Sequence, residues 1–287
     1  MARALVLLAV LAVAAPAAAQ DATPPQRVVL VDGTVLVGAV TEEADVVVVV
    51  AANGVEQRVP RDRVAEVTDL LDGRFTRYDP ARTRLFVSPT ARSLGGGAKR
   101  FSAYYIFPSV AFGVTDRLDL TIGTTIPLVS SDGAALALTG NAKFTVVETD
   151  GVAAALGGSA VVPVSSGDGI PGVVGTVYGV VTVGGEAGAV TFGAYGFYGT
   201  DFADADLGNG TALLLGLERQ VSDRFKLVSE NYVGVVFEGD GAVAVGTLSG
   251  VRFFSDQLAA DLAVALGAAD GGFTSVPIPY LGLSYTF

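Results

Sequence analysis

The chain has 287 residues with no cysteine and no histidine, and its net charge is −11. Disulfides and thiolate metal sites are therefore excluded, and so are catalysis by a Ser-His pair and the usual nitrogen ligands of zinc. The negative charge argues against nucleic-acid binding, which requires a basic surface.

The balance of apolar and charged residues favours a β-rich protein. Hydrophobic residues make up 51% and charged residues 16% of the chain, whereas ordinary domains contain roughly 25% charged residues. Beyond the N-terminus, no apolar run reaches the about 20 residues that a membrane-spanning helix needs. This leaves either a very large core or strands whose apolar side chains face lipid. The 37 glycines also disfavour long helices.

The N-terminus has the pattern of a secretory signal peptide. Arg3 is followed by an apolar run that closes on Ala17-Ala18-Ala19, and this order of charge, apolar run and small residues is typical of such peptides. An N-terminal membrane anchor is the alternative, but the run is shorter than the about 20 residues of a comfortable span. We therefore predict a signal peptide over residues 1–19 and an exported chain.

Residues 20–69 predict a small antiparallel β-domain. Asp32-Gly33 and Asn53-Gly54 are strong hairpin turns. The β-branched runs beside them are Val28–Val31, Val35–Val40, Val46–Val50 and Glu56–Val59. With Thr34 and Gly38, the first turn resembles the opening of Sm-like barrels; because the segment is acidic and exported, their RNA activity is not expected here. A polar linker is predicted over 70–83.

Residues 84–287 show a different pattern, with twelve segments of about 10 residues that are apolar at alternate positions. Leu118, Leu120 and Ile122, for example, alternate with polar or small neighbours. This is the signature of an antiparallel, up-and-down transmembrane β-barrel. We place the first strand at Arg84–Arg92, and ten strands are the alternative count. A water-soluble sandwich or lipid-binding barrel is the competing interpretation, because alternation alone does not say which face points inward.

The connections between these segments alternate in length. Tight turns such as VTDRL and VSDRF are followed by longer stretches rich in Gly, Asp and Ser. Transmembrane barrels of bacteria have short periplasmic turns and longer outer loops. The N- and C-terminal ends of the barrel chain are therefore both predicted on the periplasmic side. SLGGGAK, residues 93–99, lacks the spacing of a phosphate loop and is predicted to be a flexible outer hairpin.

Aromatic residues predict a belt at each end of the strands. Phe112, Phe144, Phe225, Phe253, Tyr285 and Phe287 lie near tight turns, and Tyr104, Tyr195, Phe197 and Phe237 near long loops.

The chain ends on a strand-like alternation of Leu281, Leu283, Tyr285 and Phe287. These positions resemble the C-terminal signal of bacterial outer-membrane β-barrel proteins, which ends in an aromatic residue. The resemblance implies a location in the outer membrane, contact with its lipid, recognition by the barrel-assembly machinery and an N-terminal β-domain in the periplasm. We expect the last strand to pair with the first, which leaves no sheet edge exposed.

Charged residues on the opposite, polar face of the strands are predicted to point into the lumen. They are Asp119, Lys143, Glu218, Lys226, Glu230, Arg252 and Asp261. Registers that keep apolar residues together set Asp119 opposite Lys143 and Arg252 opposite Asp261, with Glu230 diagonal to Arg252. We therefore predict a charge cluster near the periplasmic end, centred on Glu230, Arg252 and Asp261. It forms either salt bridges that fill a narrow lumen or a constriction that selects small polar solutes.

Little else in the sequence suggests chemistry. Asp201, Asp204 and Asp206 are a weak candidate for calcium, since their spacing is not that of an EF-hand loop; we interpret them as a solvated acidic loop. No cofactor and no enzyme activity are predicted.

The leading hypothesis is a narrow outer-membrane pore for small polar solutes. The alternative is a closed barrel that anchors the N-terminal β-domain and presents it to a periplasmic partner.

Overall fold

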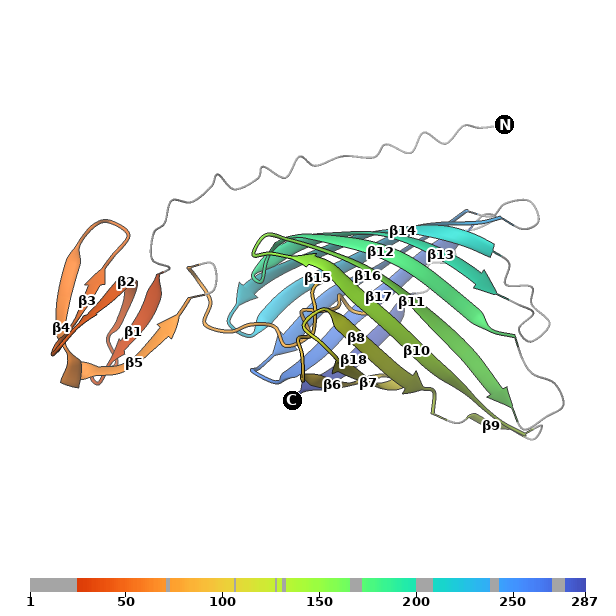
Figure 1. Cartoon of the computed structure of the whole chain (residues 1–287), viewed down its shortest axis with the longest axis horizontal. Coiled ribbons are helices and arrows are strands. Elements are labelled where there is room, and N and C mark those ends of the chain that lie inside the picture. The colour runs from red at the N-terminus through yellow and green to blue at the C-terminus, as the bar shows by residue number, and fades with distance from the viewer. Residues whose placement is uncertain are drawn as a thin grey trace, which may run out of the picture. The chain divides into compact units, whose positions relative to one another are not determined.

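The computed structural model describes residues 25–70, 73–105, 107–126, 128–130, 133–165, 172–199, 209–237, 243–269 and 277–287. It divides into two compact units, residues 1–73 and 74–287, and both are built from β-strands (Figure 1). No helix in these ranges is long and apolar enough to span a membrane. The predicted signal peptide and the aspartates of the acidic loop lie outside the described residues.

The first unit is a five-stranded antiparallel sheet in the order β4-β3-β2-β1-β5. Its strands are β1 (Gln26–Leu30), β2 (Val35–Glu43), β3 (Val46–Val50), β4 (Glu56–Pro60) and β5 (Val64–Asp69), with one 3₁₀ turn at Arg61–Arg63. The four predicted runs are therefore confirmed as strands. The sequence pattern missed β5, which pairs with β1.

Both predicted hairpin turns of this unit contain a glycine in the left-handed region. Gly33 has a φ of 84° and Gly54 a φ of 79°. The backbone N–H of Thr34 donates a 2.9 Å hydrogen bond to Asp32 Oδ1, and this bond lowers the pKa of the Asp32 carboxyl. The core of the sheet consists of Val28, Leu30, Val47, Val49 and Val59.

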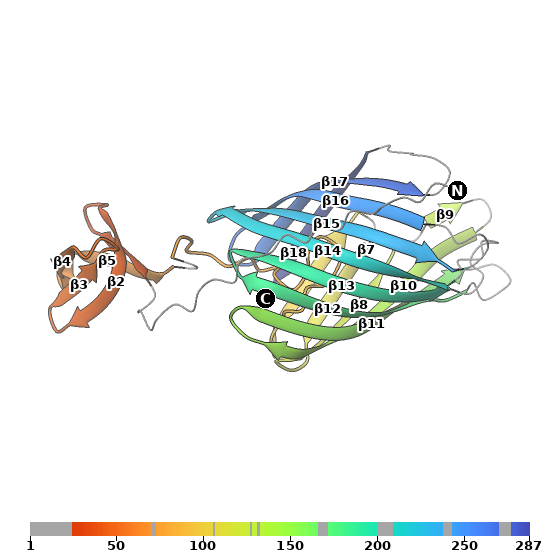
Figure 2. The same cartoon turned by 90° about the horizontal axis from the view of Figure 1, so that it is seen from above.

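The second unit contains a closed antiparallel barrel of twelve strands (Figure 2). The barrel strands are β6 (Lys99–Tyr104), β7 (Phe107–Gly113), β8 (Leu118–Thr124), β10 (Gly133–Glu148), β11 (Val152–Ser165), β12 (Val174–Gly185), β13 (Gly188–Gly199), β14 (Asn209–Ser222), β15 (Phe225–Val236), β16 (Val243–Phe254), β17 (Leu258–Ala269) and β18 (Ile278–Thr286). A short strand, β9 (Leu128–Ser130), pairs only with the start of β10. The β10–β11 and β18–β6 pairings complete the ring.

Two of the predicted pairings and the predicted faces of the strands are confirmed. Asp119 pairs with Lys143, and Arg252 pairs with Asp261. Both pairs are buried, whereas apolar residues at alternate positions, such as Ile122 at 60% and Leu262 at 52%, are exposed. These apolar side chains therefore lie on the outside of the barrel, and the paired charged side chains point into its interior.

The predicted strand number is confirmed, but the predicted first strand is wrong. Arg84–Arg92 forms no strand; a single bridge joins Arg84 to Pro89. Pro89 cannot donate a hydrogen bond to a sheet, and the amides before it bond to a side chain instead. The number of twelve strands is kept because β6 and β7 both form between residues 99 and 113. Residues 74–83 of the predicted linker fall within the second compact unit.

The predicted outer hairpin at SLGGGAK is wrong as well, because the segment lies at the tight-turn end of the barrel. The Gly97 N–H donates to the Gly113 carbonyl at 2.8 Å, and the Gly96 N–H donates to Asp116 Oδ1 at 3.1 Å. A Cβ at Gly113 would lie 1.8 Å from the Gly95 carbonyl oxygen. The glycines here allow a close backbone approach, which a flexible loop does not require.

The end of the chain closes the barrel through β6. The Phe287 N–H donates to the Lys99 carbonyl at 2.8 Å, and the Lys99 N–H donates to the Phe287 carbonyl at 2.9 Å. The four residues of the predicted C-terminal signal, Leu281, Leu283, Tyr285 and Phe287, are exposed on the apolar outer face. Near the tight turns, Phe225 and Phe253 pair at 5.1 Å between ring centroids.

The glycine of the first turn should set the stability of the N-terminal unit. We expect Gly33→Ala to lower its free energy of unfolding by about 1 kcal/mol, because an alanine at positive φ is strained. Gly33→Asn should cost less, since asparagine tolerates this conformation. Hydrogen exchange of residues 25–70 in the full-length protein measures both changes. Equal losses for the two variants would show that backbone strain at this turn is not the cause.

Candidate functional site

The interior of the barrel is occupied by a stretch of the chain itself, which we call the interior segment (residues 79–94). Asp79, Ala81, Leu85, Phe86 and Ala91 are fully buried, and none of the segment pairs as a strand with the barrel sheet. The polypeptide before it meets the tight turns, because the Thr76 N–H donates to Asp223 Oδ1 at 2.7 Å. The chain therefore enters the barrel from the tight-turn end.

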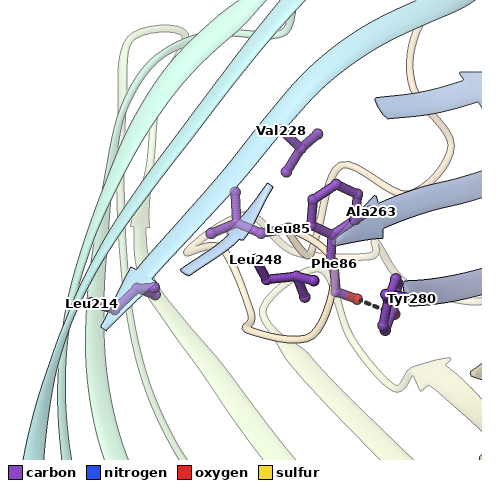
Figure 3. Packing of buried hydrophobic residues seen from close by; sticks show 7 residues of the cluster. All are labelled: Leu85, Phe86, Leu214, Val228, Leu248, Ala263 and Tyr280. Carbon is purple, nitrogen blue, oxygen red and sulfur yellow. Dashed lines mark hydrogen bonds between the residues drawn. The ribbon is translucent and has the colours of Figure 1, made fainter. Parts of the chain in front are cut away.

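One side of the interior segment packs against apolar side chains of the barrel wall (Figure 3). Leu85 and Phe86 form a cluster with Leu214, Val228, Leu248, Ala263 and Tyr280, which project inward from β14 to β18. The Tyr280 hydroxyl donates to the Phe86 carbonyl at 3.1 Å. At Gly216 a Cβ would lie 2.2 Å from Leu85 Cδ1, so glycine at this position lets the segment reach the wall.

Glu230 binds the turn at the tip of the interior segment. Its carboxylate accepts hydrogen bonds from the backbone N–H groups of Phe86, Val87 and Ser88 and from the Tyr232 hydroxyl. The register sets Lys226, and not Glu230, beside Arg252. The prediction that Glu230 lies at the centre of an ion-pair cluster is therefore wrong; the carboxylate satisfies amide donors that have no partner in a sheet.

Arg252 is the centre of the polar contacts on the segment. Its Nε donates to Asp261 Oδ1 at 2.6 Å, and its Nη1 donates to Asp79 Oδ2 at 2.9 Å. The same guanidinium donates to the carbonyls of Ala81, Arg84 and Leu85. Because the side chain is fully buried, all of its hydrogen-bonding capacity is directed at one other strand and at the interior segment.

Further ion pairs connect the segment to the surrounding strands. Asp79 also contacts Lys226 Nζ at 3.1 Å, Arg84 contacts Asp261 at 2.9 Å, and Arg92 contacts Glu218 at 2.9 Å. On the opposite wall, Lys143 and Asp119 contact each other at 3.2 Å. Lys143 also donates to the carbonyls of the segment, and Asp119 accepts the Leu94 N–H.

All seven charged residues that the alternation assigned to the interior are buried there. The sequence reasoning missed their partners in the interior segment, namely Asp79, Arg84 and Arg92. A signal for such a segment was present, because the inward positions of β14 to β18 carry large apolar residues, including Leu214 and Leu248. Apolar side chains that point into a barrel need something to pack against.

A cavity of about 450 Å³ separates the interior segment from the other side of the barrel. Its wall is formed by β6–β8 and β10–β12, and Val87, Ser88 and Pro89 at the tip of the segment also line it. Two residues predicted for the outer aromatic belt, Tyr104 and Tyr195, line this cavity. Among the described residues, no group of three or more acidic side chains could hold a metal ion.

These features define a β-barrel with an apolar exterior and an interior closed in part by its own chain. No family model and no curated protein matches the sequence. Among solved structures the chain is similar to OprD of Pseudomonas aeruginosa (9% identity, 68% of each chain covered, TM-score 0.40) and to the KdgM porin (9%, 66% of this chain and 98% of that one, 0.42). A loop-deletion mutant of OmpT, an outer membrane protein of Vibrio cholerae, is similar at 10% identity over 92% of this chain and 96% of that one, with a TM-score of 0.40. The likeness is one of β-barrel architecture alone.

Arg252 should decide whether the interior segment stays in place. We expect Arg252→Met to lower the free energy of unfolding by about 3–5 kcal/mol, because Asp79 and Asp261 would each lose a buried partner. Hydrogen exchange at the amides of Phe86 and Val87 should accelerate as the segment loosens. Arg219→Met, at an exposed position of β14, is the matched control; unchanged protection in the Arg252 variant would contradict the central role of this residue.

Proposed function

We propose that this protein is a bacterial outer-membrane channel for small polar solutes, and that the interior segment is its gate. The observation that carries the proposal is the way in which the segment occupies the barrel. Residues 79–94 occupy one side of the interior without contributing a strand. They can therefore move while the hydrogen-bonded ladder of the barrel stays intact, which a strand of the wall could not do.

The outer surface supports a location in the membrane. Large apolar side chains are exposed on almost every strand of the barrel, among them Leu120, Leu156, Phe192, Leu213, Leu262 and Leu281. Soluble monomers rarely expose contiguous apolar surface of such extent, whereas lipid-facing strands of transmembrane barrels require it. Pairing of β18 with β6 closes the ring of twelve barrel strands, and a lipid environment demands such closure.

The orientation follows from where the chain enters the barrel. The contacts of Thr76 with Asp223 and of Arg77 with Asp256, at 3.5 Å, lie at two tight turns. Such turns face the periplasm in outer-membrane barrels. We therefore assign the N-terminal unit, with its proposed Sm-like character, to the periplasm, and we propose that the C-terminal strand is read by the barrel-assembly machinery.

A charge on the outer face tests the membrane location. Leu262→Arg should lower the free energy of unfolding in lipid bilayers by about 2–4 kcal/mol if this position lies near the middle of the hydrocarbon layer. Val37→Arg, on an exposed position of β2, is the control and should have little effect. Equal effects in the two variants would place the barrel outside the membrane.

Planar-bilayer conductance tests the gate. We expect deletion of residues 79–92 to give steady conductance, while the wild-type protein stays closed apart from brief openings. The Ala91 N–H donates to Thr182 Oγ1 at 2.9 Å, so Ala91→Cys with Thr182→Cys places a cysteine on each side of this contact between the interior segment and the barrel wall. Because the chain has no other cysteine, oxidation should lock the gate shut, and reduction should restore the openings.

The deletion variant must first show the heat-modifiable gel migration of a folded barrel. If it is folded and conducts no better than the bilayer alone, the channel proposal is wrong.

A second candidate, a membrane anchor, is favoured by the density of contacts around Arg252. The barrel would then be permanently closed and would present its N-terminal unit to a periplasmic protein. Deletion of residues 20–70 distinguishes the two functions. Higher conductance would show that the unit holds the gate, whereas loss of a bound partner without a change in conductance would show an adaptor. Both proposals are non-enzymatic, which the lack of histidine in the sequence supports.

A further inference from the structure

We infer that the cavity beside the interior segment binds a small, hydroxyl-rich organic anion, such as a sugar acid, with Arg100 as its counter-charge. The inference names a solute class for the proposed channel and rests on that function only for the statement that the ligand is also transported. Binding itself requires the cavity alone.

Arg100 is a buried cation that lacks a counter-ion. Its side chain projects inward from β6, where the residue is 8% exposed, and lines the cavity. Nη1 donates to Thr83 Oγ1, and Nε has no hydrogen-bond partner. Within the ranges that the structure describes, no carboxylate lies within ion-pair distance of Arg100, whereas Arg84, the neighbouring arginine on the cavity wall, is paired with Asp261.

The charges inside the barrel do not balance, and the excess is positive. Of the side chains that the structure describes as buried, six are cationic and five are carboxylates. The cations are Arg84, Arg92, Arg100, Lys143, Lys226 and Arg252, and the carboxylates are Asp79, Asp119, Glu218, Glu230 and Asp261. The whole chain has a net charge of −11, so its interior has the opposite sign. An uncompensated buried charge is costly, and an anion in the cavity would relieve that cost.

The cavity wall beside Arg100 is rich in groups that bind hydroxyls. Successive register pairs place six inward residues in one row from β6 to β12: Arg100 is opposite Ala111, Ala111 opposite Thr121, Thr121 opposite Asn141, Asn141 opposite Ser159, and Ser159 opposite Thr176. All of these residues line the cavity. Hydroxyl and amide groups both donate and accept hydrogen bonds, which suits a polyhydroxylated ligand.

The remaining charges near the cavity favour an anion over a cation. Asp119 lines the cavity, but its carboxylate is occupied by Lys143 and by the Leu94 N–H. Glu230 is occupied by the backbone of the interior segment. The volume of about 450 Å³ lies in the range of about 300–1,000 Å³ that is usual for small-molecule sites, and it accommodates a ligand of monosaccharide size.

Isothermal titration calorimetry of the full-length, detergent-folded protein tests the site with D-gluconate as the probe. D-Glucitol has the same carbon skeleton and hydroxyls without the charge, and propionate has the charge without the hydroxyls. We expect gluconate to bind at least about tenfold more tightly than either, since a charge-assisted hydrogen bond and the hydroxyl contacts both contribute. Equal affinity for gluconate and glucitol would overturn the assignment to an anion, and equal affinity for gluconate and propionate would overturn the requirement for hydroxyls.

Two variants test whether the unpaired positive charge of Arg100 binds the ligand, one by deleting it and one by neutralising it. Arg100→Gln deletes the cation, and Ala111→Asp keeps it but places a carboxylate on the neighbouring strand directly opposite. Both should weaken gluconate binding at least about tenfold, and Ala111→Asp should also raise the thermal stability of the empty barrel. Arg117→Gln, at an exposed turn position, should leave binding unchanged. Heat-modifiable migration verifies that each variant is folded.

The outcomes separate this inference from the channel proposal. Gluconate binding that survives in both folded variants, or no gluconate binding by the wild type, overturns the site even if the gate conducts. Binding that depends on Arg100 upholds the site even if no variant conducts, and in that case it is the channel that is wrong.

Discussion

The arrangement of the barrel interior depends on Arg252, whose buried guanidinium needs hydrogen-bond and ion-pair partners. Arg252 has no access to water and bonds to Asp261 on the next strand and to Asp79 and three carbonyls of the interior segment. Removing a charge from water costs several kcal/mol unless its partners are complete. The segment therefore supplies what the wall of the barrel cannot, and the wall in turn fixes the path of the segment.

The two sides of the segment have different chemistry, and this difference divides the interior. Towards β14–β18, Leu85 and Phe86 exclude water by packing on inward-facing apolar side chains. Towards β6–β12, the segment leaves a cavity lined by hydroxyl, amide and apolar groups. Packed apolar contacts and buried ion pairs hold the segment on one wall, while the opposite wall keeps space for a solute. In the proposed gate, release of the contacts on one wall opens the interior without deformation of the barrel sheet.

The charge of the buried side chains also differs from that of the chain as a whole. The chain is acidic as a whole, and its buried side chains have an excess of one cation. Long-range attraction of anions to the acidic surface is therefore not expected, and selectivity has to come from short-range contacts inside the barrel, where the lower dielectric strengthens them. In the proposed site, recognition therefore depends on Arg100 and on the hydroxyls of the neighbouring strands.

The sequence by itself determined most of the strands, their faces and two of the charged cross-strand pairings. Alternation with a period of two is a local property, and the pairings of Asp119 with Lys143 and of Arg252 with Asp261 follow from it once apolar residues are kept together. Only the tertiary structure decided where Arg84–Arg92 lies. Its partners, Glu230, Thr182 and Arg252, are between about 90 and 170 residues away in sequence, and no local pattern encodes contacts over such a separation. The cavity and the unpaired state of Arg100 were likewise decided at that level, because they depend on which wall the interior segment packs against.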